Sequence, residues 1–136
     1  MAFLLDTNVI SETRKPRPHP AVMAWIADNA GRLRLCAATL GELQSGVEIT
    51  RRNDPAKAAE IEAWIDKLHR AFDVISIDEP VFRRWARLMD RKSDHLLIDA
   101  LIAATAEVHG LTVATRNLRD FEALGARVVN PWEGRG

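Results

Sequence analysis

The sequence has a single cysteine, no net charge and no apolar run long enough to cross a membrane. Its one cysteine, Cys36, excludes an internal disulfide and is typical of a reducing compartment. The apolar neighbours of Cys36 favour a buried small side chain over a reactive thiol. A spanning helix needs about 20 apolar residues, so we expect no membrane association. The chain reaches Asp6 without a leading positive charge or a signal-peptide core, and a cytoplasmic location follows.

Charge is balanced, because 19 Lys and Arg residues match 19 Asp and Glu residues. This balance argues against a protein that grips nucleic acid by bulk charge, but it leaves room for a local basic patch. The 47% hydrophobic and 28% charged content is that of an ordinary globular protein. We find no linker, internal repeat or low-complexity segment, so residues 1–136 are expected to form a single domain.

Short apolar runs alternate with longer segments in which apolar residues recur at helical spacing. Strands are predicted at residues 3–5, 33–38, 73–77, 111–114 and 127–129. Three prolines predict an extended loop over Lys15–Pro20. Asp54 and Pro55 predict the start of a helix, with Asp54 as its cap and Pro55 in the first turn. Strands separated by helices predict an α/β fold of three layers, with a parallel sheet of about five strands flanked by helices.

One predicted helix, starting at a cap on Ser93 or Asp94, is apolar or small at almost every position except Asp99. A carboxylate buried without a partner costs several kcal/mol, so Asp99 must reach water or be compensated, for example by a bound cation. In the middle of a helix an aspartate gains nothing from capping. We therefore favour a functional role for Asp99.

Three further carboxylates fall where α/β sheets gather ligands at the carboxyl ends of their strands. Asp6 ends the first predicted strand, Glu42 starts the helix after the second, and Asp120 follows the fourth. Carboxylates suit Mg²⁺ or Mn²⁺, which could orient a water and stabilise charge on a phosphate during hydrolysis. Structural alternatives stay open, since Asp6 could cap a helix, and Glu42 and Asp120 could complete capping boxes with Thr39 and Asn117.

Four stretches, in this order, resemble the PIN-domain family, and within it the VapC toxins of type II toxin-antitoxin pairs and the similar FitB proteins. They are LLDTNVISE at 4–12, TLGELQSGV at 39–47, DALIAATA at 99–106 and LTVATRNLRDF at 111–121. The closing NPW at 130–132 also resembles that family. The resemblance covers nearly the whole chain and implies a metal-dependent endoribonuclease, a hydrolase that uses Mg²⁺ or Mn²⁺.

The resemblance also implies a set of site residues. The catalytic and metal-binding acids of the family map onto Asp6, Glu42, Asp99 and a fourth, often less essential, Asp120. Neighbouring positions are expected to support these ligands or to position RNA, with structural capping as an equal alternative. These positions are Thr7, Asn8, Thr115, Arg116 and Asn117.

An RNA substrate requires a positive approach to an acidic centre. Arg116 and Arg119 stand beside Asp120 and are the better candidates for phosphate contact. The basic stretches at 83–92 and 14–17 are at least as easily explained as solvated surface. The four histidines show no metal-ligand spacing.

Partners also follow from the resemblance. It implies a homodimer held inactive by a cognate VapB-like antitoxin, whose carboxyl-terminal segment can push a basic side chain toward the acids, with operator DNA bound only through the antitoxin. A second hypothesis is a FitB-like subunit of a DNA-binding regulatory complex with little or no nuclease role. A phosphatase or related phosphotransfer enzyme ranks last, because Asp6-Thr7-Asn8 lacks the second aspartate of a D-x-D pair.

Overall fold

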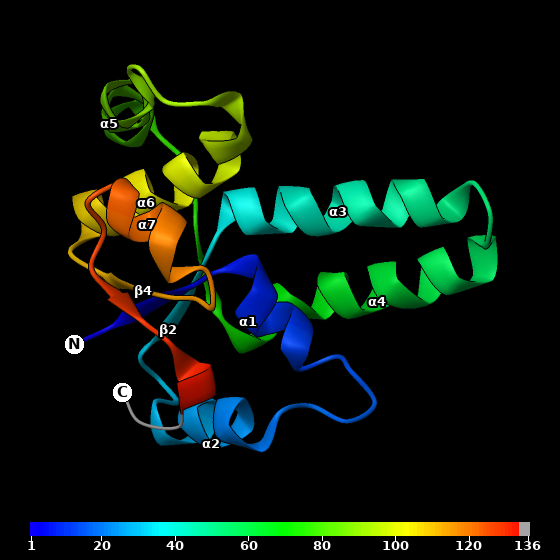
Figure 1. Ribbon diagram of the computed structural model, residues 1–136. Helices are drawn as coiled ribbons and strands as arrows, with labels where there is room; N and C mark the ends of the chain where they lie inside the picture. Colours follow the sequence, from blue (N-terminus) through cyan, green and yellow to red (C-terminus); the bar gives the residue numbers. More distant parts are fainter. Residues whose placement is uncertain (134–136) are drawn as a thin grey trace.

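A computed structural model describes residues 1–133 of the chain (Figure 1). The strands are β1 (Phe3–Leu5), β2 (Leu33–Cys36), β3 (Asp73–Ile75), β4 (Thr112–Ala114) and β5 (Val128–Val129). The α-helices are α1 (Thr7–Glu12), α2 (Pro20–Asp28), α3 (Ala37–Arg51), α4 (Pro55–Ala71), α5 (Glu79–Met89), α6 (Leu97–His109) and α7 (Leu118–Ala123). Two short 3₁₀ helices are η1 (Asp94–Leu96) and η2 (Pro131–Glu133). Among these described helices, none combines the length and apolar character needed to cross a bilayer.

The five strands form one parallel sheet in the order β3-β2-β1-β4-β5, which confirms the predicted α/β architecture. The central strand β1 pairs with β2 on one side and with β4 on the other, so Leu4 lies opposite both Arg34 and Val113. Every predicted strand exists, but four of them are shorter than predicted by one or two residues. For example, β2 ends at Cys36 because α3 already begins at Ala37.

Alternation along β1 divides the core into two parts, one on each face of the sheet. Leu4 packs into a cluster with residues of α6 and α7 such as Ile102 and Phe121. Phe3 and Leu5 point to the other face, where residues of α1 and α2 such as Ile10 and Val22 cover them. The helices therefore form layers on both faces of the sheet.

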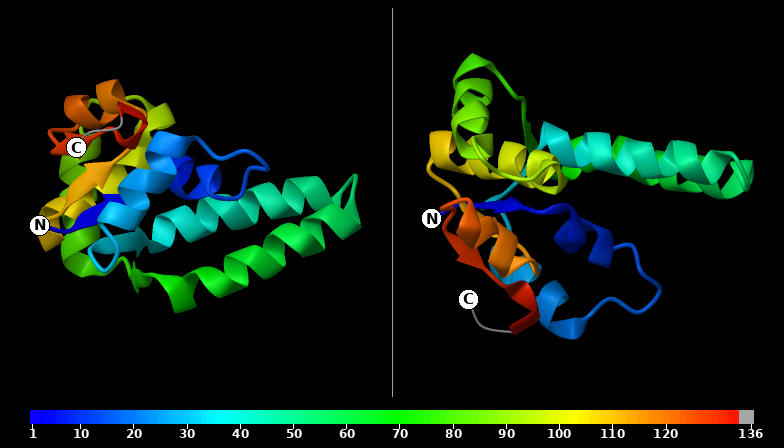
Figure 2. Two further views of the ribbon diagram at one scale, coloured as in Figure 1. Left: turned by 90° about the horizontal axis from the view of Figure 1, so that it is seen from below. Right: turned by 45° about the horizontal axis from the view of Figure 1, so that its top comes forward.

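Helices α3 and α4 form a hairpin that extends away from the sheet (Figures 1 and 2). A small third cluster of Val47, Ala58 and Ile65 lies within it. Asp54 caps the start of α4 by accepting a hydrogen bond from the N–H of Lys57 at 3.0 Å, and Pro55 occupies the first turn, as predicted. The base of α3 remains beside the sheet, so residues of its first turns can reach the edge where the strands end.

The predicted start of α6 was wrong. Helix α6 begins at Leu97, after η1, and neither Ser93 nor Asp94 caps it with a side-chain hydrogen bond. Asp99 consequently lies in the first turn of α6 and not in mid-helix. There the positive end of the helix dipole favours its charge. Gly110 ends α6 with a φ of 68°, a left-handed conformation that glycine adopts without strain.

Candidate active site

Asp6 directly follows β1, the strand at which the strand order reverses, with β2 on one side of β1 and β4 on the other. Such switch points are where open α/β sheets bind ligands. One carboxylate oxygen of Asp6 accepts the Thr7 N–H at 2.7 Å, and the other accepts the Thr115 hydroxyl at 2.8 Å. Asp6 is thus a helix cap, as the structural alternative proposed, and the residue is only 5% exposed. The cap fixes the orientation of the carboxylate between β1 and β4.

Glu42 reaches the same edge of the sheet from α3. Its Oε1 accepts a hydrogen bond from the Thr7 hydroxyl, which belongs to α1. The capping-box alternative for Glu42 was wrong, because α3 starts at Ala37 and its first turn has no side-chain cap. Thr39 is instead fully buried, with its hydroxyl oxygen 3.5 Å from that of Thr7. Sequence reasoning missed this role of Thr39, and the only signal was its position one turn before Glu42.

Asn117 connects the remaining two carboxylates. Its side-chain amide donates to Oδ2 of Asp99 at 3.2 Å and to Oδ2 of Asp120 at 3.0 Å. Its backbone N–H donates to the Thr115 hydroxyl oxygen at 2.9 Å, which ties the loop after β4 to Asp6. The capping-box alternative for Asp120 was also wrong, because Asp120 accepts from the side chain of Asn117 rather than from its backbone N–H.

The four carboxylates interact electrostatically. Burial and, after it, the negative charges of Asp6, Glu42 and Asp120 together raise the pKa of Asp99 to about 6, against an opposing effect of His95. Burial also raises the pKa of Asp6 above its ordinary value, although its hydrogen bonds from Thr115 and Thr7 oppose the change. Each charge therefore disfavours the others at neutral pH.

No positive side chain compensates these four acids within residues 1–133. The ion pairs found in that part of the chain, with N to O distances up to 4.0 Å, involve other carboxylates. In the same residues no three His, Cys, Asp or Glu side chains converge closely enough to enclose a metal by themselves. Mg²⁺ usually takes one or two carboxylates and keeps several waters, so an open, uncompensated group of acids suits a hydrated cation of this kind.

Two more predicted positions lie next to this group. The amide of Asn8 donates to the Thr115 hydroxyl oxygen at 3.5 Å, and its carbonyl oxygen accepts the Arg116 N–H at 3.3 Å. These contacts place the backbone of Arg116, whose side chain is exposed, next to the acidic centre, by which we mean Asp6, Glu42, Asp99 and Asp120. The nine predicted site positions are therefore brought together by four segments of the chain.

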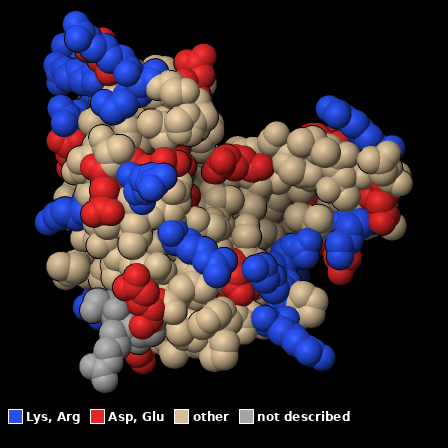
Figure 3. Space-filling view, in the orientation of Figure 1, with Lys and Arg blue, Asp and Glu red and all other residues tan. Residues whose placement is uncertain are grey.

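Other candidates from the sequence lie elsewhere or are already paired. Lys and Arg side chains gather over α5 and again along the loop after α1 (Figure 3). On α5, Arg84 pairs with Glu107 at 2.7 Å and Arg83 with Glu79 at 3.8 Å, which fits an ordinary solvated surface. Cys36 is buried as expected, and burial raises the pKa of its thiol, which makes it a poor nucleophile.

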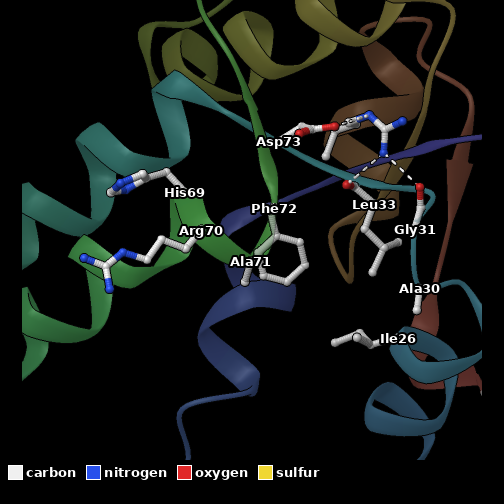
Figure 4. Close-up of a pocket in the computed structure, with 10 residues that line it drawn as sticks. Ile26, Ala30, Gly31, Leu33, His69, Arg70, Ala71, Phe72 and Asp73 are labelled. Carbon is white, nitrogen blue, oxygen red and sulfur yellow. Dashed lines mark hydrogen bonds and ion pairs between the residues drawn. The ribbon is translucent and has the colours of Figure 1, made fainter.

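A hollow of about 250 Å³ lies at the opposite edge of the sheet (Figure 4). Leu33 and Asp73, the first residues of β2 and β3, line it together with Phe72 and Arg34. Arg34 is held there by the carbonyl oxygens of Gly31 and Leu33 and by Asp73. None of the four carboxylates of the acidic centre lines this hollow, so it has no part in the site.

Comparison with known proteins gives one consistent picture. A family model described as PIN domain matches residues 3–126. The chain is 40% identical to the VapC ribonuclease Y4jK of Sinorhizobium fredii and 37% identical to the toxin FitB of Neisseria gonorrhoeae, each alignment covering 96% of this chain and 98% of the relative. It superimposes with a TM-score of 0.81 and 33% identity on a chain in a structure of FitAB bound to an IR36 DNA fragment, covering 96% of this chain and 95% of that one.

Proposed function

This chain belongs to the PIN-domain family, and we propose that it is a metal-dependent endoribonuclease that serves as the toxin of a VapBC-type toxin-antitoxin system. Relatives named as a ribonuclease and a toxin, aligned over nearly their full length, support this function. The observation that carries the metal-dependent chemistry is the uncompensated acidic centre at the switch point of the sheet. We further propose that residues 1–136 act as a single PIN domain.

The proposed ligands are Asp6, Glu42, Asp99 and Asp120, with Mg²⁺ or Mn²⁺ as the ion. A bound divalent cation supplies Lewis-acid chemistry, because it lowers the pKa of a coordinated water and stabilises negative charge on a phosphate. In the reaction a water oxygen bonds to phosphorus, the bond from phosphorus to one ribose oxygen breaks, and that oxygen takes up a proton. The RNA strand is thereby hydrolysed.

The other residues of the site orient the carboxylates. Thr115 and the N–H of Thr7 hold both oxygens of Asp6, the Thr7 hydroxyl holds Glu42, and Asn117 holds Asp99 and Asp120 at a fixed separation. Such contacts preorganise the ligands, so that little reorganisation accompanies the reaction. The exposed side chain of Arg116 is suited to contact an RNA phosphate.

We also propose that the activity is controlled by a small cognate antitoxin and that the toxin is a homodimer which reaches operator DNA only through that antitoxin. The similarity to a FitAB complex bound to DNA supports such an assembly. A DNA-binding subunit without nuclease function would have no need for four mutually repelling carboxylates. We therefore prefer the nuclease to the purely regulatory alternative.

A cleavage assay with Asp99→Asn tests the proposal. Labelled single-stranded and structured RNAs are incubated with wild type or variant in Mg²⁺, Mn²⁺ or EDTA. We expect the wild type to cut only with metal and the variant to fall below detection while remaining folded. Asp66→Asn makes the same chemical change on the exposed surface of α4 and should cut like the wild type. Equal cutting by wild type and a folded Asp99→Asn protein, or full activity in EDTA, would overturn the proposal.

A further inference from the structure

A hollow of about 450 Å³ is lined by Arg116 and by none of the four carboxylates of the acidic centre. Its walls come from three parts of the chain, namely the loop after α1, the loop after β4 and η2. We call it the tryptophan pocket, and its lining residues other than proline are Glu12, Lys15, Arg17, His19, Arg116 and Trp132.

One wall of the tryptophan pocket is fixed by a buried carboxylate. Glu12, the last residue of α1, is only 4% exposed. Its Oε1 forms an ion pair with Nζ of Lys15 at 2.8 Å, and its Oε2 accepts a hydrogen bond from the backbone N–H of His19 at 2.9 Å. These two contacts hold both ends of the proline-containing loop against α1, although no regular structure forms there. The loop is therefore a built surface and not a loose connection.

The opposite wall is a stacked pair of side chains. The guanidinium of Arg116 lies over the ring of Trp132, 4.8 Å from its centroid, in a cation-π arrangement. Trp132 is partly buried, and its backbone N–H donates to Oδ1 of Asn130 at 2.9 Å. Arg116 is exposed, so a planar group can reach the pair from solvent.

The charge of the tryptophan pocket is opposite to that of the acidic centre. Glu12 is neutralised by Lys15, whereas Arg17 and Arg116 have no carboxylate within 4.0 Å among residues 1–133. The two regions adjoin, because the N–H of Arg116 bonds to Asn8, which in turn contacts the Thr115 hydroxyl that holds Asp6. A ligand that spans the tryptophan pocket and the acidic centre would need a flat apolar part with a negatively charged group next to it.

We propose that the tryptophan pocket binds one nucleotide of single-stranded RNA next to the phosphate held at the acidic centre. This inference rests on the proposed ribonuclease function and names a subsite of it. The base stacks on the Arg116 and Trp132 pair, since unpaired bases stack on aromatic rings and on guanidinium planes. Arg17 and the guanidinium edge of Arg116 contact the phosphates on either side.

Binding is measured with Asp99→Asn as the parent, so that cleavage does not interfere. The probes are a fluorescent oligouridylate and an abasic oligoribonucleotide of equal length, which keeps the phosphates but has no bases. Trp132→Leu should weaken oligouridylate binding about tenfold and change abasic binding little, because a stacked base is lost. Trp132→Phe keeps a ring and should restore most of the affinity.

Arginine variants separate stacking from charge. Arg116→Gln should weaken both probes, whereas Arg116→Lys keeps the charge and should weaken oligouridylate more than the abasic probe. Arg70→Gln, at an exposed position of the hollow in Figure 4, is the matched control and should change neither. Should Trp132→Leu melt at a much lower temperature, the Arg116→Lys comparison decides the question alone.

The outcomes separate this inference from the proposed function. Base-dependent binding that Trp132→Leu removes supports the tryptophan pocket, even if the wild type then cuts no RNA. Unchanged oligouridylate binding by Trp132→Leu, or an equal loss for both probes, overturns it, even if the wild type cuts RNA with metal. If Trp132→Leu keeps RNA binding but loses antitoxin binding, the inference is likewise overturned, because the pocket would then serve the protein partner.

Discussion

Helix α1 has a buried carboxylate at each end, and the two differ in almost every other respect. Asp6, before the first turn, is 5% exposed, and Glu12, in the last turn, is 4% exposed. Asp6 faces other carboxylates, and its pKa is raised, chiefly by burial. Glu12 faces Lys15 and the N–H of His19, and these hydrogen bonds lower its pKa. Burial alone therefore does not distinguish a site carboxylate from a structural one.

The difference lies in compensation. At Glu12 the chain itself supplies a positive charge, so the carboxylate is already satisfied and stabilises the fold around it. In the acidic centre residues 1–133 supply hydroxyl and amide donors but no cation within 4.0 Å, so the negative charge remains available to a ligand. The comparison predicts that substitutions at the two ends of α1 act on different properties. Substitution of Asp6 should mainly lower activity, and substitution of Glu12 should mainly lower stability.

The largest expected effect is on cleavage. Asp6→Asn keeps a good helix cap but removes the charge of a proposed metal ligand. Mutation of a residue that only supports a metal ligand costs up to about a hundredfold in activity. We therefore expect the rate of RNA cleavage by Asp6→Asn to fall by more than that. Glu12→Gln should keep the rate constant within a few-fold and raise KM, because it loosens the loop of the tryptophan pocket. Steady-state kinetics on one RNA substrate measures both. A comparable loss of rate constant in the two variants would show that compensation does not separate them.

The next effect is stabilisation by metal. A cation that binds only the folded protein should raise the free energy of unfolding of the wild type by about 3 kcal/mol at a hundredfold excess over Kd. Metal should raise the free energy of unfolding of Asp99→Asn much less, and that of Glu12→Gln as much as that of the wild type. Thermal melts in EDTA, Mg²⁺ and Mn²⁺ measure the difference. An equal gain in wild type and Asp99→Asn would place the metal elsewhere.

Local sequence patterns were sufficient for much of the fold. The apolar runs at residues 3–5 and 111–114 located β1 and β4, and Asp54 with Pro55 located the start of α4. Strand ends were less accurate, because a residue joins the sheet only where a partner strand lies opposite. The start of α6 was misplaced because η1 precedes it, and no local pattern marks where a 3₁₀ turn becomes an α-helix.

That the four acids gather at one end of the sheet could be predicted from the sequence, but their hydrogen-bond partners could not. Both capping boxes had the right spacing, yet the Glu42 carboxylate bonds to Thr7, far away in the sequence, and that of Asp120 to a side chain instead of a backbone N–H. A capping pattern describes what a helix could do in isolation, and tertiary contacts offered better donors here. The meeting of Arg116 and Trp132 depends on β4 and β5 lying side by side, which no local pattern shows.

The smallest expected effect is on the pH dependence of stability, measured in EDTA, and its sign differs between the two regions. The pKa of Asp99 rises from 3.8 to about 6 on folding, so its contribution to stability is full below 3.8 and is lost as the pH rises through 6. Asp99→Asn escapes this loss and should be more stable than the wild type at neutral pH. Because Asp99 is partly exposed to solvent, the gain should be only about 1 kcal/mol.

The pH dependence of stability that Glu12 contributes has the opposite sign to that of Asp99. Its pKa is lowered from 4.5 on folding, chiefly by the hydrogen bond with Lys15, so its contribution is full above 4.5 and is lost as the pH falls through the lowered value. Glu12→Gln should therefore be less stable than the wild type at neutral pH, and the difference should shrink in acid. Denaturant unfolding of the three proteins across this range tests both signs. If Asp99→Asn and Glu12→Gln shift stability in the same direction at neutral pH, the contrast between an uncompensated and a compensated carboxylate is wrong.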